Sequence, residues 1–450
     1  MNGDRQLRAL AALSSVATLT VLLGASGSGS ELARAAAAAF APRPVSVAAT
    51  VPQADTADTA RHGDPSSTHA ATAAAPSGNA DGAGNASDTI ANSEGESSIN
   101  DEASEDPETT DTADATTATT PGDRTASNIK HIFVITLAGQ GYDATFGSGS
   151  AATYLNGTLR PKGTLLANFS SLSGSGIADR LAMVSGQPPN AATKAGCTTY
   201  SQIPPLTNPD DDGVITATGC LYPNTIVTVG EQIQGRRLTW KGYAEDLDQG
   251  PSGGATTCRR PNPDQPDDTI DPRPGDTYAT RNVPWVYFRS LIEVANCDSG
   301  MTPLATLTTD LATATTTPNF AFISPGSCTD GSHPACADGQ PGGLAAADAF
   351  LERTVPAILA SAAYQQDGLL LITFAGGPGG TDAATNNGAL VLSRFATAGS
   401  TVSTAYDPYS LLKTVEDLFA LPKYLANAND ATSFADDVLA AAQPPKPGDD

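Results

Sequence analysis

The composition of the chain changes abruptly near residue 128, and this change limits what each part can fold into. Residues 35–127 are mostly Ala, Thr, Ser, Pro and acidic residues, and Phe40 is their only aromatic residue. Such a segment cannot bury enough apolar surface to offset its conformational entropy, so we expect a flexible acidic linker. The run at 130–137 is rich in β-branched and aromatic residues and predicts a buried parallel strand. A folded domain therefore begins at about residue 128.

The first residues have the pattern of an export signal. Arg5 and Arg8 precede the uncharged apolar run 9–25, and small residues follow it. This order is typical of a secretory signal peptide. An uncleaved membrane anchor is the alternative, although the run is short for a membrane span and contains four Ser and Thr residues. We predict a secreted or extracytoplasmic protein. Its expected parts are a signal peptide at 1–27, a disordered linker at 28–127, an α/β domain at 128–442 and a disordered tail at 443–450.

The charge and the histidine count exclude several classes of function. The chain has 48 acidic against 24 basic residues, and its net charge of −24 disfavours binding to nucleic-acid phosphates. Of its four histidines, His62 and His69 fall in the predicted linker. His131 and His333 remain for the domain, too few for a histidine-rich metal centre. We expect no nucleic-acid partner, and membrane contact only through an uncleaved N-terminal segment.

Candidate strands and helices alternate along the folded part. Besides 130–137, buried-strand patterns occur at 238–243, 320–324, 369–374 and 389–392. Helical patterns occur at 176–185, 228–234, 345–361 and 410–421. This alternation predicts one α/β domain with a mainly parallel sheet. Ligands of such sheets bind at the carboxyl ends of the strands, so we expect the chemistry in the loops after Leu137, Ser324 and Phe374.

Eight segments of the domain occur in the order of a known enzyme family. They are 130–135, 141–147, 181–186, 240–246, 284–288, 318–323, 355–361 and 409–419. Together they resemble the bacterial phosphoesterase family that includes secreted acid phosphatases and phospholipase C-type enzymes. The resemblance implies an alkaline-phosphatase-like three-layer α/β sandwich. It also implies hydrolysis of phosphate esters by a metal-assisted Ser or Thr nucleophile, with acidic, Asn and His side chains as metal ligands.

Measured against that family, the residues expected to carry the chemistry are missing. The acidic residue expected after the first strand is Ala138 here, followed by Gly139. An Asp-Glu pair expected after residue 374 is replaced by Ala375 and Gly376. Gly176 occupies the place of the nucleophile. None of these side chains can attack phosphorus or coordinate a metal.

Other residues also fill the places where the family carries histidine. They are Asn282, Thr329, Ser332 and Pro408. Asp330 matches the family's acidic residue, whereas His333 is displaced by one position. The packing segments persist while the site is emptied, which indicates a pseudoenzyme whose domain is still needed in folded form. We expect no cofactor, or a divalent metal if the protein is active.

Four remaining carboxylates open another interpretation. They are Asp143, Asp179, Asp330 and Asp382. Together they could form an oxygen-only cation site suited to Ca²⁺. We favour the simpler assignment in which Asp143 caps a helix and Asp179 and Asp382 are solvated loop residues, because such a site needs several further oxygens.

Serines near the nucleophile position open a second alternative. Ser175 lies one residue before Gly176 and Ser173 three before it, and either could substitute if the loop shifted. With His333 and Asp330, one of them would supply the residues of a Ser-His-Asp hydrolase. No Gly-x-Ser-x-Gly turn follows a predicted strand, so we expect His333 to be a solvated loop residue.

The six cysteines all lie between residues 197 and 336. An even number in an exported protein favours disulfides, although sequence alone leaves their connectivity open. Chain order and the family resemblance imply the pairs Cys197–Cys220, Cys258–Cys297 and Cys328–Cys336.

The sequence therefore predicts an exported pseudoenzyme that binds a small-molecule or cell-wall ligand. One alternative is a working acid phosphatase or phospholipase C-like hydrolase with a rearranged site. Another is a structural cell-surface protein whose cleft is filled by side chains.

Overall fold

The structure, a computed structural model, describes residues 128–250, 257–293, 296–378 and 383–439. The predicted signal peptide, linker and C-terminal tail lie outside the described residues, as does Asp382. Within these ranges, no helix is long and apolar enough to cross a membrane.

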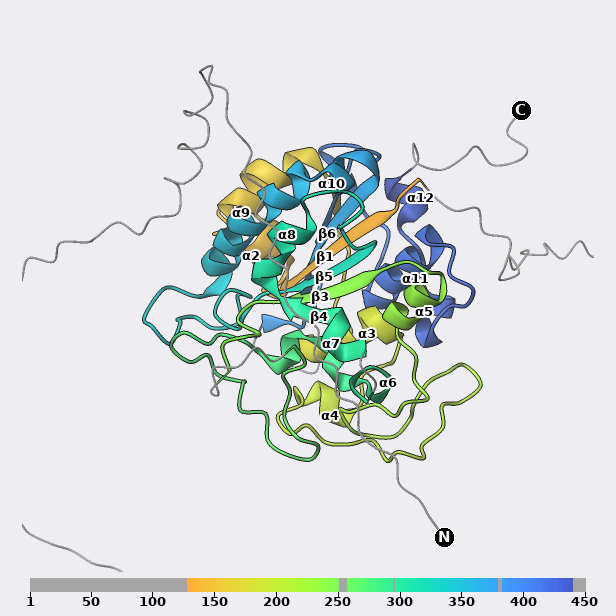
Figure 1. Cartoon of the computed structure of the whole chain (residues 1–450). Coiled ribbons are helices and arrows are strands. Elements are labelled where there is room, and N and C mark those ends of the chain that lie inside the picture. The colour runs from red at the N-terminus through yellow and green to blue at the C-terminus, as the bar shows by residue number, and fades with distance from the viewer. Residues whose placement is uncertain (1–127, 251–256, 294–295, 379–382, 440–450) are drawn as a thin grey trace, which may run out of the picture. The chain divides into compact units, whose positions relative to one another are not determined.

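An eight-stranded sheet forms the centre of the domain (Figure 1). Its strands are β1 (His131–Ala138), β2 (Thr164–Leu166), β3 (Trp240–Ala244), β4 (Met301–Pro303), β5 (Phe320–Ser324), β6 (Gly368–Ala375), β7 (Ala389–Ser393) and β8 (Ser400–Val402). Their order across the sheet is β4-β3-β5-β1-β6-β7-β2-β8. β7 runs antiparallel to its neighbours β6 and β2, and the other neighbouring pairs are parallel. The sheet is mainly parallel, as predicted.

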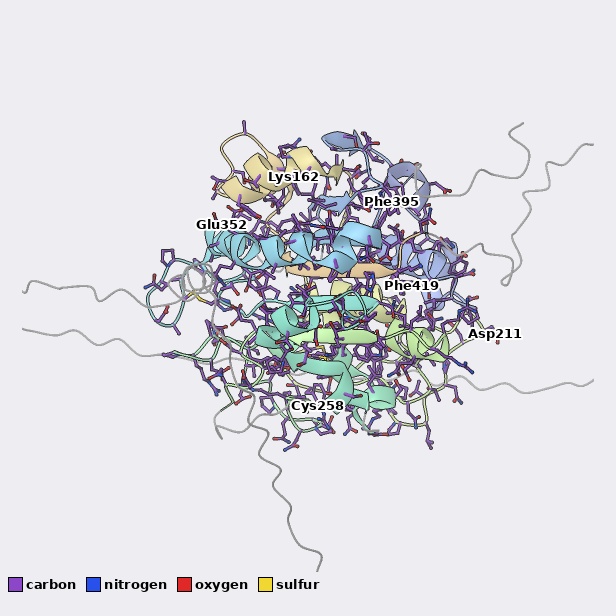
Figure 2. All side chains as sticks on the ribbon, turned by 45° about the horizontal axis from the view of Figure 1, so that its top comes forward. Lys162, Asp211, Cys258, Glu352, Phe395 and Phe419 are labelled. Atoms are coloured by element: carbon purple, nitrogen blue, oxygen red, sulfur yellow. A yellow bond between two sulfur atoms is a disulfide. The ribbon has the colours of Figure 1, made fainter. Side chains whose placement is uncertain are left out.

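Helices cover both faces of this sheet. The α-helices are α2 (Tyr142–Phe146), α3 (Gly176–Ser185), α4 (Ala191–Lys194), α5 (Val229–Gly235), α6 (Arg289–Ile292), α7 (Asn296–Gly300), α8 (Leu307–Asp310), α9 (Gly343–Ala360), α10 (Ala362–Asp367), α11 (Pro408–Leu418) and α12 (Ala435–Val438). Figure 1 shows α8, α9 and α10 on one side of the sheet and α3, α5 and α11 on the other. On the outer side of α9, exposed Glu352 points away from the sheet (Figure 2). The three-layer α/β sandwich is therefore confirmed.

The central strand β1 explains the continuous apolar pattern of the sequence. Ile132 and Val134 belong to the core that includes residues of α3 and α11. Phe133, Ile135 and Leu137 belong to the core that includes residues of α9. Side chains of a strand alternate between its two faces, so a strand buried on both faces is apolar throughout.

The long predicted elements are present, with ends shifted by up to three residues. The strand predicted at 238–243 is β3, and the helix predicted at 410–421 is α11. The three edge or near-edge strands β2, β4 and β8 were not predicted, because three residues carry too little pattern.

Three disulfides join loops of the domain. They are Cys197–Cys220, Cys258–Cys297 and Cys328–Cys336. This is the pairing that chain order and the family resemblance imply.

Candidate functional site

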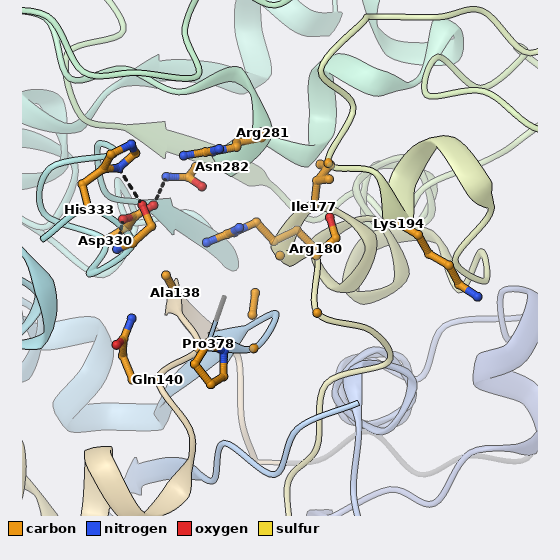
Figure 3. Close-up of a pocket in the computed structure, with 18 of the residues that line it drawn as sticks. Ala138, Gln140, Ile177, Arg180, Lys194, Arg281, Asn282, Asp330, His333 and Pro378 are labelled. Carbon is orange, nitrogen blue, oxygen red and sulfur yellow. Dashed lines mark hydrogen bonds between the residues drawn. The ribbon is translucent and has the colours of Figure 1, made fainter. Parts of the chain in front are cut away.

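A pocket of about 670 Å³ opens at the carboxyl ends of β1 and β6 (Figure 3). Its walls come from the loop after β1, the loop before α3, the loop after β5 and the loop after β6. The loops in which the parallel-sheet rule places the chemistry therefore meet at one cavity. Three of the side-chain-poor positions, Ala138, Gly176 and Ala375, line it directly.

At three glycines in the loops that form the pocket, an added side chain would meet neighbouring atoms at short distance. A Cβ atom on Gly139 would collide with the carbonyl oxygen of Gly376. A Cβ atom on Gly376 would lie 2.7 Å from the carbonyl oxygen of Gly174, and one on Gly176 would lie 2.6 Å from Nη1 of Arg180. The neighbouring atoms at Gly139 and Gly376 belong to the backbone, whereas the neighbour at Gly176 is the end of the Arg180 side chain.

Arg180 brings a positive charge over this floor. It follows Gly176 by one helical turn of α3, and helical side chains point back toward the helix N-terminus. Its Nε donates to Oγ1 of Thr136 at 3.3 Å, and Nη2 donates to the carbonyl oxygen of Leu137 at 3.4 Å. Burial lowers the pKa of Arg180 to about 10, against the opposing effect of Asp330, so the guanidinium stays charged at neutral pH.

Asp179 is fully buried, so the expectation that it is a solvated loop residue is wrong. It lies in the first turn of α3. One carboxylate oxygen accepts from the backbone N–H of Leu172 at 2.8 Å, and the other accepts from that of Gly376 at 2.6 Å. Burial raises the pKa of Asp179 to about 7, although these two donors and neighbouring Arg180 lower it. Asp179 therefore ties two loops of the pocket floor together.

Asp330 and Asn282 form a buried pair in the wall of the pocket. Each is only 1% exposed. Asn282 Nδ2 donates to Oδ2 of Asp330 at 2.8 Å and to the carbonyl oxygen of Pro325 at 3.0 Å. The backbone N–H of Ser332 donates to Oδ1 of Asp330 at 2.7 Å. The other amide atom, Oδ1 of Asn282, is buried without a hydrogen-bond partner.

Two further cations line the pocket. Arg281 precedes Asn282 in the short 3-10 helix Thr280–Asn282 and is partly exposed. Figure 3 shows the guanidinium groups of Arg281 and Arg180 on the same side of the cavity, with Asn282 between them. Lys194, at the end of α4, is exposed at the rim, and its ammonium group points away from both arginines. Of the described acidic residues, Asp330 alone lines the same pocket.

The candidate Ser-His-Asp arrangement is not assembled. Ser175 and His333 both line the pocket. His333 Nδ1 lies 3.0 Å from the carbonyl oxygen of Ser327, and Nε2 lies 3.7 Å from Asp271. Among the described residues, no hydrogen bond joins His333 to Ser175 or to Asp330. His333 is half-buried rather than fully solvated, and its ring is held by its own loop.

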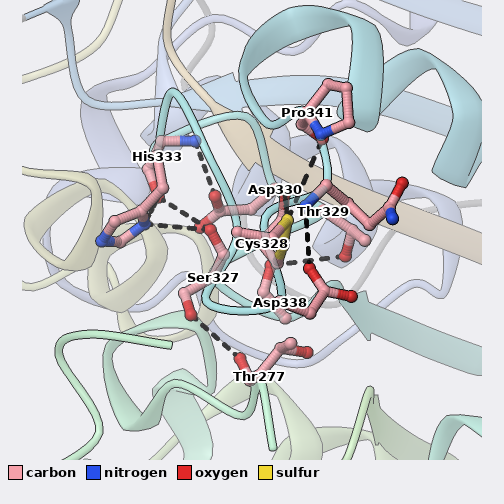
Figure 4. Close-up of a disulfide and its surroundings, with 12 residues drawn as sticks. Thr277, Ser327, Cys328, Thr329, Asp330, His333, Asp338 and Pro341 are labelled. Carbon is pink, nitrogen blue, oxygen red and sulfur yellow. Dashed lines mark hydrogen bonds between the residues drawn. A yellow bond between two sulfur atoms is a disulfide. The ribbon is translucent and has the colours of Figure 1, made fainter. Parts of the chain in front are cut away.

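The disulfide Cys328–Cys336 shapes this loop (Figure 4). It closes the segment that carries Asp330 and His333, and Ser327 Oγ anchors the same segment by donating to the carbonyl oxygen of Thr277 at 3.1 Å. The residues at the two missing histidine positions have structural partners, since Thr329 donates to Glu245 and the Ser332 backbone binds Asp330. The disulfide and these hydrogen bonds therefore hold the loop in place along one side of the pocket.

The other candidate positions lie away from the pocket. Asp143 is exposed in the first turn of α2 and makes no capping hydrogen bond, so its expected capping role is wrong. Asp407 does cap a helix, because its side chain accepts from the backbone N–H of Ser410 at 2.9 Å. Pro408 then occupies the first position of α11, where its fixed φ angle suits a helix start.

The residues present do not fit a divalent metal. Within the described ranges, no three His, Cys, Asp or Glu side chains converge so that they could hold an ion. Asp330 has its oxygens engaged by Asn282 and Ser332, and Asp179 has its oxygens engaged by backbone donors. Asp382 lies outside the described residues. The donor set that the family resemblance implies is not assembled at this pocket.

Sequence reasoning missed the cations of the pocket. The comparison with a metal-dependent family points only to missing nucleophile and metal-ligand side chains, and it does not point to arginine or lysine at the pocket. Arg180 follows Gly176 at helical spacing, which is a usable signal, since a helical residue four positions on covers the place of the earlier one. Arg281 and Lys194 carried no local signal, because only the tertiary structure brings them to α3.

No protein-family model matches the sequence, and no curated protein matches it. Some solved structures are similar at low identity. A protein in the alkaline phosphatase superfamily from Vibrio parahaemolyticus is 8% identical, with a TM-score of 0.41, covering 69% of this chain and 72% of that chain.

Two further solved structures are similar to the chain. A putative sulfatase from Bacteroides thetaiotaomicron is 10% identical, with a TM-score of 0.40, covering 70% of this chain and 76% of that chain. A phosphonate monoester hydrolase from Silicibacter pomeroyi is 13% identical, with a TM-score of 0.33, covering 70% of this chain and 78% of that chain.

Proposed function

We propose that the domain is a phosphoesterase-like pseudoenzyme that binds a small anionic ligand and does not hydrolyse it. The pocket floor carries this proposal. Backbone or guanidinium atoms fill the space where side chains on Gly139, Gly176 and Gly376 would project. The enzymes that the sequence resembles place catalytic and metal-binding side chains in these loops, whereas here backbone atoms and the Arg180 guanidinium occupy that space.

The charge of the pocket supports an anionic ligand. Arg180, Arg281 and Lys194 line it, against Asp330 as the acidic residue of the described lining. This excess of positive charge stands in a chain whose net charge is −24. A local positive cleft on an acidic protein attracts anions to that cleft. The ligand class that fits is a phosphorylated or otherwise anionic small molecule, including a fragment of a cell-wall polymer.

Three disulfides support the proposal that the protein works outside the cytoplasm. Disulfides persist in oxidising compartments and are rare in the cytosol. The open cavity, for its part, argues against a purely structural protein whose cleft is filled by side chains.

Turnover assays with the full-length chain test the proposal. The substrates are p-nitrophenyl phosphate, bis-p-nitrophenyl phosphate and p-nitrophenyl sulfate, each with added Mg²⁺, Ca²⁺, Mn²⁺ or Zn²⁺. We expect no hydrolysis above that of the metal salt alone, and a substoichiometric metal content in the purified protein. Turnover that Asp330→Asn abolishes would overturn the proposal in favour of a hydrolase with a rearranged site.

A further inference from the structure

The guanidinium groups of Arg180 and Arg281 line the pocket, and neither forms an ion pair with a carboxylate of the described residues. Arg281 has no hydrogen-bond or ion-pair partner within the described part of the chain. The hydrogen bonds of Arg180 go to neutral groups of β1. Two carboxylates lie near Arg180, those of Asp330 and Asp179. The oxygens of Asp330 already accept from Asn282 and from the backbone of Ser332, and those of Asp179 accept from backbone N–H groups. Charged donors that face a cavity without acceptors are free to bind a ligand anion.

A buried acceptor stands between these two cations. Asn282 is 1% exposed, and its Oδ1 has no hydrogen-bond partner. The amide cannot be turned over, because its Nδ2 donates to two acceptors, the carbonyl oxygen of Pro325 and the carboxylate of Asp330. In Figure 3 the oxygen of Asn282 is turned toward the side on which Arg180 lies. Buried polar groups normally have partners, so this oxygen can accept from a donor that the described residues do not supply.

We propose that Arg180 and Arg281 bind the oxyanion of a phosphate or sulfate monoester without a metal ion, and that Asn282 accepts a hydrogen bond from a hydroxyl group of the same molecule. This inference rests on the proposed binding function and adds the class of ligand. Planar guanidinium groups match tetrahedral oxyanions through paired N–H donors. The guanidinium of Arg180 supplies the positive charge that metal ions supply in the enzymes that the sequence resembles.

The ligand must therefore have two parts. An oxyanion alone would satisfy the arginines and leave Asn282 Oδ1 unpaired. A hydroxyl group close to the ester oxygen would satisfy both, since Asn282 lies between the two guanidinium groups. Leaving a buried acceptor unpaired costs more than the average hydrogen bond contributes, so the hydroxyl group should matter measurably.

A matched pair of esters tests this two-part recognition on the unaltered full-length chain. Isothermal titration with 2-hydroxyethyl phosphate and with ethyl phosphate, both in excess chelator, compares ligands that differ in one hydroxyl group. We expect the hydroxyl-bearing ester to bind about tenfold more tightly. The corresponding pair of sulfate esters shows which oxyanion the site takes, and the same preference in either pair supports the inference.

Charge-neutral variants separate the arginine from general electrostatics. Arg281 is partly exposed and unpaired in the described structure, so Arg281→Gln should fold, as unchanged circular dichroism would verify. We expect it to weaken binding about tenfold or more. Lys162→Gln removes the same unit of charge from an exposed position that does not line the pocket, and we expect its affinity to stay within about twofold of that of the unaltered chain, because distant exposed charges are screened.

Three results would overturn the inference: binding that appears only when a divalent metal is restored, equal affinity for both esters of each pair, or equal effects of the two variants. With no turnover, each would leave the proposed non-hydrolytic function standing. Hydrolysis of the esters would instead defeat the proposed function itself.

Discussion

Single atoms decide the character of the pocket floor. The lack of a side chain at Gly176 and the position of the Arg180 guanidinium are coupled in space, since a Cβ atom at Gly176 would lie 2.6 Å from Nη1 of Arg180. A serine cannot be restored at Gly176 without displacing that arginine. The sequence shows the glycine at position 176. It does not show that the Arg180 guanidinium lies beside that glycine.

The close packing at Gly376 predicts a large stability loss for Gly376→Ala. Its φ of +76° disfavours alanine, and the new methyl group would lie 2.7 Å from the carbonyl oxygen of Gly174. Gly149 has a similar φ of +85° with nothing within 4 Å, so Gly149→Ala isolates the backbone effect. Urea unfolding should show a loss of about 1–2 kcal/mol for Gly149→Ala and about 1–3 kcal/mol more for Gly376→Ala. Equal losses would contradict the close packing of the loops.

Buried Asp179 predicts a pH dependence of folding stability. Its pKa of about 7 in the folded state stands above the ordinary value of 3.8, so the folded protein holds more protons between these values. The contribution is complete below about pH 4 and is lost as the pH rises to about 7. Relative to the unaltered chain, Asp179→Asn should flatten this fall by up to about 1.4 kcal/mol per pH unit, measured by urea unfolding. Parallel curves for the two proteins would show that Asp179 does not titrate in this range.

At the scale of helices and strands, the apolar pattern of the sequence predicts where the elements lie. It does not predict which loops come into contact. The strand at 320–324 was predicted to the residue, because a strand buried on both faces is apolar along its whole length. Helix α3 was likewise predicted with its observed bounds. The approach of Gly139 to Gly376 joins loops far apart in the chain, and no local pattern encodes it.

Two aspartates near helix starts allow a direct comparison. Asp407 caps α11 through a hydrogen bond to the Ser410 backbone, whereas Asp143 makes no capping hydrogen bond to α2. Asp407→Ala should therefore cost about 1 kcal/mol of folding stability, and Asp143→Ala less than about 0.5 kcal/mol. Thermal unfolding of the two variants measures the difference. An equally small loss of folding stability for both variants would contradict the capping role of Asp407.

For the molecule as a whole, the placement of charge matters more than its sum. The net charge of −24 argues against nucleic acid as a partner and gives no hint of a cationic pocket. Arg180, Arg281 and Lys194 come from three separate segments that line one pocket only after folding. The scarcity of histidine was the more informative count, since the pocket of a metal-dependent hydrolase would need several. The type of domain and the position of the candidate pocket could thus be predicted from the sequence. The positive charge of the pocket could not.

One measurement tests the central claim most directly, because it observes binding and hydrolysis in the same sample. Phosphorus NMR of 2-hydroxyethyl phosphate is recorded with the full-length chain, first in chelator and then with excess Mg²⁺ or Zn²⁺. We predict that the ester signal shifts or broadens on addition of the protein in chelator, and that no inorganic phosphate signal appears with either metal. An unchanged ester signal in chelator, followed by growth of inorganic phosphate once metal is added, would contradict a metal-free binding pocket and identify a working phosphatase.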